Sequence, residues 1–457
     1  MSLEIIILAA GQGTRMRSTL PKVLHQVGGK SMLQHVVETS LQLNPKSIHV
    51  VTGYGSDTVK ENTLAALGEK AQGIRWVLQK EQKGTGHAVA QAMPEVDNSS
   101  TCLILYGDSP LVNVETLRDL CAANSGLSLM TAKPENPEGL GRIVRDSQGK
   151  VTGIIEHKDA TEEQRLIGEI NSGIMACRAD LLNRWVAGLD NRNSQGEYYL
   201  TDIVAKAVTD GEVVRTDLAS DPNRLMGVNS CAELAVAERV FQNSIAQQLM
   251  RDGVTLMDPA RLDVRGEPKF GSDCIVDINV FLEGNITIGN NVFIGPNCVV
   301  RNSIIGDHCR LHANSIIDDA TLGDACEIGP FARVRPGTEL SKSVKIGNFV
   351  EVKKSTLGEG SKANHLAYVG DSTVGNDVNI GAGVITCNYD GANKSQTIIG
   401  NDVFVGSDSQ LVAPVEIGDG VTIGAGSTIT RNVEADMLAI SRAQQKSIAN
   451  WRRPKKK

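Results

Sequence analysis

The chain has 457 residues, of which 41% are hydrophobic and 4% aromatic, and its formal net charge is −7. This length predicts two or more domains with sizeable cores, and the negative charge argues against a dedicated nucleic-acid binder. Nine cysteines without a CxxC pair indicate neither a zinc site nor a disulfide framework, and reduced thiols fit a cytoplasmic protein. The first apolar run is only six residues long, so we expect neither a signal peptide nor a membrane span.

Over residues 1–230, short apolar runs alternate with segments of helical periodicity. The segments 30–42 and 114–123 have the helical pattern, and the apolar runs are typical of buried parallel strands. These runs are Ile5–Ala10, His49–Val51, Trp76–Leu78 and Cys102–Tyr106. The alternation predicts a doubly wound, Rossmann-like α/β domain that binds its ligands beyond the carboxyl ends of the strands.

The first strand runs directly into Gly11-Gln12-Gly13-Thr14-Arg15-Met16, and Lys22 follows shortly after. The two glycines let the backbone approach a ligand closely, so that successive N–H groups can hold phosphate oxygens. Arg15 would add a bidentate phosphate donor, and Lys22 a compact positive charge. The spacing matches neither a Walker A loop nor a complete dinucleotide fingerprint, and a plain tight turn is the other interpretation.

A second candidate site is Tyr106-Gly107-Asp108, at the end of another strand. An Asp there, opposite a phosphate loop, is well placed to hold Mg²⁺, which prefers oxygen ligands. The alternative is an Asp that caps a turn or a helix. The loop Gly84-Thr85-Gly86-His87-Ala88 is suited to contact a base or a ribose, although His87 alone is more simply explained as structural.

A helix is predicted from about Ala232 to Arg251, within a linker at 231–252, and Gly253 follows its end. One face of this helix carries Leu234, Ala237, Phe241 and Ile245. We expect it to be a stiff connector between a first domain at 1–230 and a second domain at 253–457.

From about Ile288 to Ile429, aliphatic residues recur in steps of six and five, and Gly often follows them. Neither a helix nor an open strand repeats in this way, but a parallel β-helix with coils of roughly 18 residues does. The period matches hexapeptide-repeat proteins, whose coils are left-handed, so we expect a left-handed parallel β-helix from about Asp258 to Val433. Small cysteines at Cys298, Cys309 and Cys326 should lie in its core. The basic end at 452–457 is either a solubilising tail or a clamp for phosphate groups.

Charged residues cluster on the predicted β-helix between 331 and 368. Arg335 and Lys353 are one coil apart and should be neighbours, and adjacent cations repel unless an anion such as a sugar phosphate lies between them. His365 is a candidate general base, with Glu351 as a possible partner, although a lone surface histidine is usually structural. The repeat breaks between Ile380 and Ile399, where an inserted loop is expected to project over a binding face.

The glycine loop and the motifs at 84–88 and 106–108 resemble those of sugar-phosphate nucleotidyltransferases. Three further motifs resemble the uridylyltransferase members of that group: Glu156-His157-Lys158, Asn171-Ser172-Gly173 and Glu197-Tyr198-Tyr199-Leu200-Thr201-Asp202. Together with the hexapeptide repeats, they make the whole chain similar to the bacterial family of bifunctional N-acetylglucosamine-1-phosphate uridyltransferase/glucosamine-1-phosphate acetyltransferases.

The resemblance implies a nucleotidyltransferase site in the first domain, with Arg15 and Lys22 as catalytic residues and Asp108 and Asn229 as Mg²⁺ ligands. Gly11 and Gly13 would hold the UTP phosphates with Arg15. The other substrate-binding positions that it implies there are Leu8, Ala9, Ala10, Gln79, Gly84 and Thr85, then Tyr106, Gly107, Gly141, Glu156, Asn171 and Tyr199. Among these, Gln79, Gly84 and Thr85 would surround the uracil, and the last four would hold the N-acetylglucosamine moiety. Ser109 departs from the family, which usually has a small aliphatic residue there.

In the β-helix, the resemblance implies His365 as the general base of acetyl transfer. The sugar phosphate and the acetyl donor would contact Arg335, Lys353, Tyr368, Asn379, Asn388 and Tyr389. Coenzyme A would lie at Ala382, Ser407, Ala425 and Arg442. Asn364 and Ala367 depart from the family pattern beside His365 and put the local hydrogen bonds in doubt.

The implied function is the synthesis of UDP-N-acetylglucosamine, a cell-wall and lipopolysaccharide precursor. Acetyl-CoA would acetylate glucosamine-1-phosphate, and UTP would then react with N-acetylglucosamine-1-phosphate. The family also implies a homotrimer, and the residues themselves favour a cytoplasmic protein without nucleic-acid or membrane partners. Two alternatives stay open: a nucleotidyltransferase whose β-helix only assembles or regulates it, and a non-catalytic assembly module. The constellation around His365 argues against the first alternative, and intact Arg15, Lys22 and Asp108 argue against the second.

Overall fold

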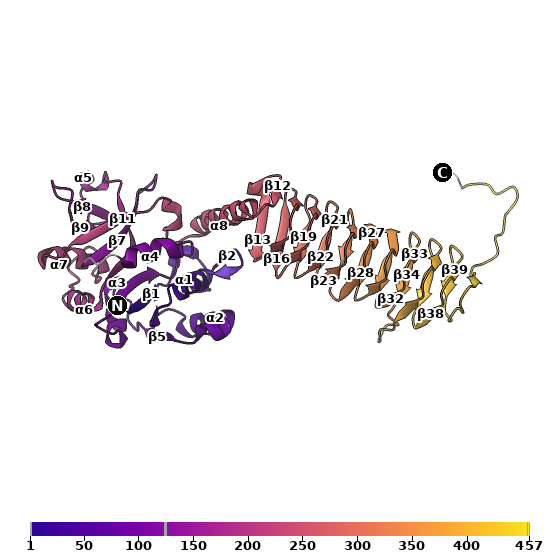
Figure 1. The fold of residues 1–457 in the computed structure, drawn as a ribbon, viewed down its shortest axis with the longest axis horizontal. Coiled ribbons are helices and arrows are strands. Elements are labelled where there is room, and N and C mark those ends of the chain that lie inside the picture. The colour runs from indigo at the N-terminus through magenta and orange to yellow at the C-terminus, as the bar shows by residue number, and fades with distance from the viewer. Residues whose placement is uncertain (1, 123–125, 455, 457) are drawn as a thin grey trace. The chain divides into compact units, whose positions relative to one another are not determined.

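The computed structural model describes residues 2–122, 126–454 and 456. The chain forms two compact units, Met1–Phe241 and Gln242–Lys457 (Figure 1). Helix α8 (Cys231–Arg251), which the sequence predicted almost to the residue, runs from the first unit into the second. The finer division into two domains and a linker stays a prediction. No helix in the described part of the chain is long and apolar enough to cross a membrane.

The first unit is built on a mixed sheet with the strand order β11-β7-β10-β6-β1-β4-β5, and β8 and β9 join it beside β10. The apolar runs predicted as parallel strands are β1, β4, β5 and β6, which pair in parallel. β10 pairs antiparallel with both of its neighbours, β6 and β7, which makes the sheet mixed. The strands are β1 (Leu3–Ala9), β4 (Ser47–Thr52), β5 (Ile74–Leu78), β6 (Thr101–Tyr106), β7 (Leu127–Ala132), β8 (Arg142–Arg145), β9 (Val151–Ile155), β10 (Ile170–Arg178) and β11 (Val214–Leu218). A short hairpin, β2 (Gln26–Val27) and β3 (Lys30–Ser31), stands apart from this sheet.

Helices cover both faces of this sheet, as alternate residues of β1 show. Ile6 and Leu8 face one core, which α3, α6 and α7 complete, whereas Ile5 and Ile7 face another, which α1, α2 and α4 complete. This confirms the doubly wound α/β architecture. The helices are α1 (Met32–Leu41), α2 (Ser56–Leu67), α3 (Thr85–Ala92), α4 (Val114–Ala122), α5 (Glu162–Arg165), α6 (Ala179–Ala187) and α7 (Ile203–Thr209). The helical segment predicted at 114–123 ends at a residue outside the described part of the chain.

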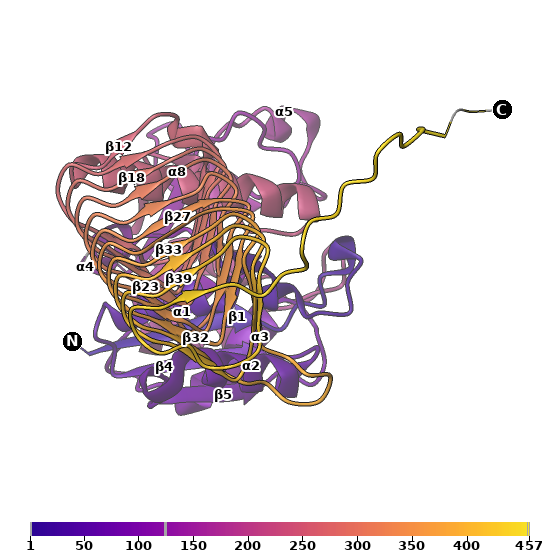
Figure 2. The same cartoon turned by 90° about the vertical axis from the view of Figure 1, so that its right-hand side faces the viewer.

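The second unit is the predicted left-handed parallel β-helix, whose described strands form three parallel sheets of eleven, ten and nine strands (Figure 2). Through most of this unit, each strand pairs with the strand three further along the chain. Val334, Val352 and Val369 therefore stack in register, and all three are fully buried. Cys298, Cys309 and Cys326 lie in this core, as predicted. The coils begin at β12 (Thr255–Leu256) and end at β41 (Leu438–Ala439), slightly beyond both expected limits.

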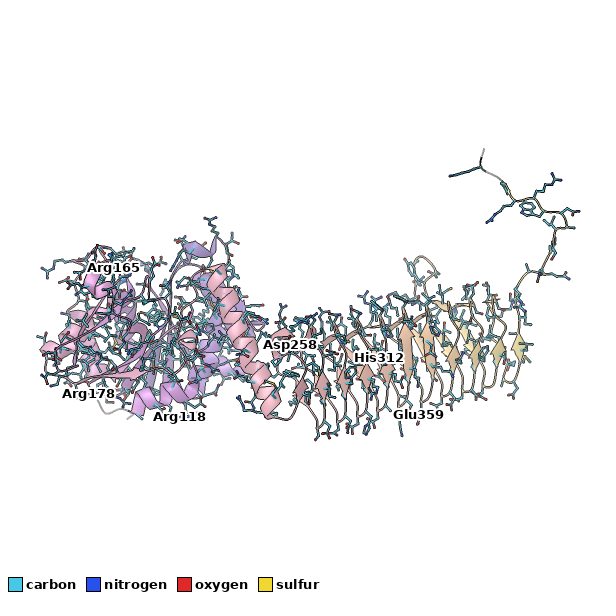
Figure 3. All side chains as sticks on the ribbon, turned by 90° about the horizontal axis from the view of Figure 1, so that it is seen from above. Arg118, Arg165, Arg178, Asp258, His312 and Glu359 are labelled. Carbon is cyan, nitrogen blue, oxygen red and sulfur yellow. The ribbon has the colours of Figure 1, made fainter. Side chains whose placement is uncertain are left out.

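Small polar residues such as Ser315 and Ser361 are buried beside the turns. Charged residues at the turns lie on the outside of the coils, as Glu359 does in Figure 3. The regular coil is interrupted where predicted, by a loop between β34 (Ile385–Cys387) and β35 (Thr397–Ile399). Beyond β41 the chain is exposed and has no regular strand or helix through its described residues, and Lys455 and Lys457 of the basic end lie outside them.

Candidate functional sites

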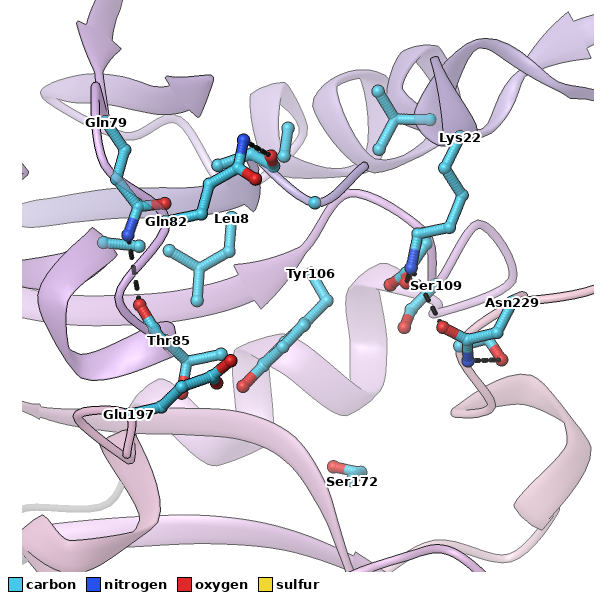
Figure 4. Close-up of a pocket in the computed structure, with 18 of the residues that line it drawn as sticks. Leu8, Lys22, Gln79, Gln82, Thr85, Tyr106, Ser109, Ser172, Glu197 and Asn229 are labelled. Atoms are coloured by element: carbon cyan, nitrogen blue, oxygen red, sulfur yellow. Dashed lines mark hydrogen bonds and ion pairs between the residues drawn. The ribbon is translucent and has the colours of Figure 1, made fainter. Parts of the chain in front are cut away.

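A cavity of about 530 Å³ opens in the first unit where β1 and β6 end (Figure 4). These strands are parallel neighbours, with Leu8 paired to Tyr106, so the segments that follow them meet at one edge of the sheet. The predicted positions that line the cavity are Leu8, Ala9, Ala10, Gly11, Lys22, Gln79, Gly84, Thr85, Tyr106, Asp108 and Asn229. The topology therefore gathers residues from five separate parts of the chain around one space.

Two oxygens from distant segments converge on a single cation in this cavity (Figure 4). The Lys22 ammonium donates hydrogen bonds to Asp108 Oδ2 and, at 3.0 Å, to Asn229 Oδ1. Both oxygens thus already point at one positive charge, and carboxylate and amide oxygens suit a hard cation. No cluster of three or more His, Cys, Asp and Glu side chains that could hold a metal occurs in the described residues. A metal held by Asp108 and Asn229 would therefore complete its shell with water and substrate phosphates.

The glycine loop shapes the backbone around Lys22. Gly13 has a φ of +67°, and a Cβ there would come within 2.6 Å of Lys22 Cβ, so any larger residue would displace the lysine. Gly11 faces open space, because nothing lies within 4 Å of the Cβ position, which leaves room for a ligand close to the backbone. Gly13 and Arg15 do not line the cavity, and the Arg15 side chain is exposed.

The wall opposite Lys22 is held by two glutamines. Gln79 Nε2 donates to Gly84 O at 3.1 Å, and Gln82 Nε2 donates to Ala10 O at 3.0 Å. The second bond ties the loop before α3 to the end of β1. Gln82 was not predicted as a site residue, although its place between Gln79 and the loop at 84–88 was a usable signal. Ser172 and Glu197 also line the cavity and were quoted only as parts of motifs.

Tyr106 forms another wall, and Gly173 makes room for it. A Cβ on Gly173, whose φ is +86°, would lie 2.5 Å from Cε2 of the Tyr106 ring. Burial raises the pKa of the Tyr106 phenol well above its ordinary value, and the nearby carboxylates of Glu156 and Asp108 raise it further. Tyr106 is therefore a neutral hydrogen-bonding group at physiological pH.

The residues implied for the sugar lie together, beside the cavity lining. Asn171 N donates to Gly141 O at 2.9 Å, and the Gly141 Cβ position is 3.4 Å from a Glu156 carboxylate oxygen. Thr201 Oγ1 donates to Glu156 Oε1 at 3.0 Å, yet burial still raises the pKa of Glu156. Tyr199 is buried, and its hydroxyl accepts from Gln195 Nε2 at 2.8 Å. None of the four implied residues lines the cavity itself, and neither does Gly107.

On the β-helix, Arg335 and Lys353 occupy neighbouring coils, as expected from their spacing. Arg335 Nη1 donates to Glu351 Oε1 at 2.6 Å, and Lys353 Nζ lies 3.7 Å from Asp371 Oδ2. Each cation thus already has a carboxylate partner. The expectation that two adjacent cations require a bound anion between them was wrong. It did not take into account that the carboxylates of Glu351 and Asp371 offset the two positive charges.

The inserted loop adds a further cation to this cluster. Lys394, opposite Tyr389 in the loop, lies against Lys353, whose ammonium lowers the pKa of Lys394. Asn388 Nδ2 donates to the Tyr368 hydroxyl at 3.3 Å, so the base of the loop contacts the same face. Tyr389 itself is exposed. The sequence did not single out Lys394, because only the folded loop brings it to Lys353.

His365 ends β30 (Lys362–His365), in the coil after Asn348. Its Nδ1 lies 3.1 Å from Asn348 Oδ1, whereas Glu351 is bonded to Arg335 instead. An amide oxygen can only accept, so this contact assigns the proton of the neutral ring to Nδ1 and leaves Nε2 free to take a proton. Asn348 was missed, although it precedes His365 by one coil.

The residues implied for coenzyme A stack on one another, because they lie at or next to the same turn in successive coils of the β-helix. Asp408 N donates to Ala382 O at 2.7 Å, and Gly426 N donates to Ser407 O at 2.8 Å. Gly383 N, beside Ala382, donates to His365 O at 3.3 Å, which puts the histidine in the same stack of turns. The implied positions Ala425 and Arg442 are joined by a 2.6 Å bond from Arg442 Nη1 to Ala425 O. Asn379 starts β33 (Asn379–Ile380) and pairs with β30.

Comparisons with known proteins cover both units. Residues 5–148 match the MobA-like NTP transferase domain, residues 265–347 the GMPPB C-terminal domain, and residues 396–431 the bacterial transferase hexapeptide (six repeats). A solved UDP-glucose pyrophosphorylase complexed with UDP-glucose covers 53% of this chain and 100% of its own, at 17% identity and a TM-score of 0.43.

Two curated relatives align over the full length. Bifunctional protein GlmU of Marinobacter nauticus is 52% identical over 456 residues, which cover 99% of each chain. Bifunctional protein GlmU of Pseudomonas putida (strain GB-1) is 53% identical over 458 residues, which cover 100% of this chain and 99% of the relative. At this identity over the whole length, the chain belongs to the GlmU family of bifunctional proteins.

Proposed function

We propose that this chain is a bifunctional enzyme that makes UDP-N-acetylglucosamine. Its second unit transfers the acetyl group of acetyl-CoA to glucosamine-1-phosphate. Its first unit then transfers a uridylyl group from UTP to N-acetylglucosamine-1-phosphate and releases pyrophosphate. Full-length membership of the GlmU family supports both activities. The observation that carries the proposal is the convergence of Lys22, Asp108 and Asn229 beside the glycine loop.

In uridylyl transfer, an oxygen of the sugar phosphate attacks the α-phosphorus in line as the bond to pyrophosphate breaks. This chemistry needs positioning and charge neutralisation more than a protein nucleophile. The backbone from Gly11 to Gly13 holds phosphate oxygens, and Lys22 stabilises the charge that develops on the leaving pyrophosphate. Mg²⁺, when bound at Asp108 and Asn229, supplies further positive charge to the phosphates.

In acetyl transfer, the amine of glucosamine-1-phosphate attacks the thioester carbonyl of acetyl-CoA. The new N–C bond forms, the C–S bond breaks, and the amine proton passes to His365 Nε2 and then to the departing thiolate. Asn348 keeps Nδ1 protonated, so that Nε2 is the basic atom. Arg335, Lys353 and Lys394 supply positive charge for the sugar phosphate.

The proposal includes a homotrimer. Phe331, Phe349 and Leu366 take the same turn in three successive coils, all with left-handed backbone, and are 50%, 57% and 64% exposed. The two phenylalanine rings stack at 5.3 Å. Other coils have Asn, Asp or Gly at this turn, where the left-handed backbone suits those residues. Bulky, exposed apolar residues at the same place are typical of a contact surface. Leu366 is also the neighbour of His365 in the chain. Sedimentation as a monomer at working concentration would contradict this part of the proposal.

A cytoplasmic location completes the proposal, with a role in supplying precursors for peptidoglycan and lipopolysaccharide. All nine cysteines, each among the described residues, are free, which fits a reducing compartment. The function is tested by incubating the purified chain with glucosamine-1-phosphate, acetyl-CoA, UTP and Mg²⁺. UDP-N-acetylglucosamine should form only when all four are present. The chain could instead make UDP-N-acetylglucosamine from supplied N-acetylglucosamine-1-phosphate, UTP and Mg²⁺ and yet fail to acetylate glucosamine-1-phosphate. That result would indicate a nucleotidyltransferase with a purely structural β-helix.

A further inference from the structure

Asn229 is fixed in the first unit through its backbone as well as its side chain. Its side-chain Nδ2 donates to Gly227 O at 3.3 Å, which assigns the amide so that Oδ1 faces Lys22. Its backbone N–H donates to Glu233 Oε2 at 2.6 Å. The side-chain Nδ2, the side-chain Oδ1 and the backbone N–H of Asn229 therefore each have a hydrogen-bond partner. Of these partners, Glu233 is the one that belongs to α8.

Glu233 is well suited to hold this N–H. It lies in the first turn of α8, where the positive end of the helix dipole stabilises a carboxylate. Its own backbone N–H donates to Ser230 Oγ at 3.3 Å, which anchors that turn against the segment before it. A hydrogen bond to an ionised acceptor is also stronger than a neutral one. Glu233 thus ties the backbone of Asn229 to the first turn of a 21-residue helix.

The same short segment also contacts Asp108, the other oxygen ligand. Val228 N donates to Asp108 O at 2.9 Å, and a Cβ on Gly227 would lie 3.3 Å from Asp108 Oδ1. The segment 227–229 therefore lies against the metal ligand on one side and is held by Glu233 on the other. Without the carboxylate, the Asn229 N–H loses its partner, and the amide oxygen is free to turn away from Asp108.

We propose that Glu233 is a positioning residue that preorganises Asn229 for the divalent metal of uridylyl transfer. This inference rests on the proposed function, which makes Asp108 and Asn229 the metal ligands. Glu233 acts through the Asn229 backbone and does not itself contact the metal. Residues that hold a metal ligand from behind typically change metal affinity by about 10–100-fold when they are removed. Glu233→Ala should therefore weaken metal binding by about tenfold or more.

The test measures metal binding directly. Mn²⁺ is titrated into the full-length protein in the presence of UDP-N-acetylglucosamine, and the free ion is followed by electron paramagnetic resonance. Glu233→Ala should raise the Mn²⁺ dissociation constant, whereas Glu233→Gln, which keeps an oxygen acceptor, should give a smaller increase. Asn243→Ala, an exposed change further along α8, serves as the control and should bind as the wild type does.

Kinetics separate positioning from general damage. In Glu233→Ala, uridylyl transfer should need more Mg²⁺ but recover most of its kcat at saturating metal, and acetyl transfer should be unchanged. Wild-type Mn²⁺ affinity in Glu233→Ala, alongside lost affinity in Asp108→Ala, would overturn the role of Glu233 alone. Wild-type affinity in Asp108→Ala as well would overturn the proposed metal site itself. Equal affinity losses in Glu233→Ala and Glu233→Gln would show that charge, and not the bond to Asn229, is what matters, and would overturn the inference.

Discussion

Gly173→Ala tests whether the Tyr106 wall of the cavity depends on a missing side chain. A Cβ at position 173 would lie 2.5 Å from the Tyr106 ring, and the φ of +86° is strained for any L-residue. The backbone strain costs roughly 1–2 kcal/mol, and forcing an extra methyl into a packed site typically costs about 1–3 kcal/mol. Moving the ring off its rotamer costs only about 0.5–1.5 kcal/mol. The Tyr106 ring should therefore move, because moving it costs less than keeping the overpacked contact. The main effect of the substitution should then be a changed cavity shape and only a moderate loss of stability.

The expected result is a folded protein whose first unit loses about 1.5–3.5 kcal/mol of stability, the backbone strain plus the ring displacement. Its kcat/KM for uridylyl transfer should fall by about 10–100-fold, because a misplacement of about 1 Å can have that effect. Steady-state kinetics with UTP and N-acetylglucosamine-1-phosphate measure this, and acetyl transfer by the same sample should stay normal.

Gly168→Ala is the matched control for this prediction. Nothing lies within 4 Å of its Cβ position, and its backbone is not left-handed, so this variant should keep wild-type kinetics. A folded Gly173→Ala protein with wild-type uridylyl transfer would refute the reasoning about Tyr106.

Three further predictions concern the two sites. Asp108→Ala should abolish uridylyl transfer and leave acetyl transfer nearly unchanged, as paired assays on one preparation would reveal; loss of both in a folded protein would contradict the separation of sites. His365→Ala should cut acetyl transfer by roughly 10²–10⁴-fold, the usual contribution of a general base, whereas Arg335→Ala should mainly raise the KM for glucosamine-1-phosphate; near-normal acetylation by folded His365→Ala would exclude it as the base.

The sequence predicted the architecture of both units because each has a characteristic period. The hexapeptide rhythm determines which residues stack, and therefore located the coils, the buried cysteines and the inserted loop. Alternating apolar runs and helical segments likewise identified the parallel strands β1, β4, β5 and β6. The antiparallel β10 was not foreseen, because strand direction depends on pairing between distant segments and leaves little trace in a local pattern.

The sites could be predicted only in part. The periodicity put Arg335 beside Lys353, but it could not show that Glu351 and Asp371 each take one of these cations. Lys394 and Gln82 reach their neighbours through loops whose conformation has no repeat to reveal it. Asn229 and Glu233 are close in sequence, so a contact between them could have been predicted. Its relevance to the site could not, because only the fold brings Asn229 to Lys22 and Asp108.

A complementation assay tests most directly the claim that one chain carries two independent sites. Asp108→Ala and His365→Ala are each supplied with glucosamine-1-phosphate, acetyl-CoA, UTP and Mg²⁺. Alone, Asp108→Ala should accumulate N-acetylglucosamine-1-phosphate, and His365→Ala should make almost no product. Mixed together, they should produce UDP-N-acetylglucosamine, because the acetylated intermediate can diffuse from one protein to the other. A mixture of two folded variants that yields no UDP-N-acetylglucosamine would contradict the account.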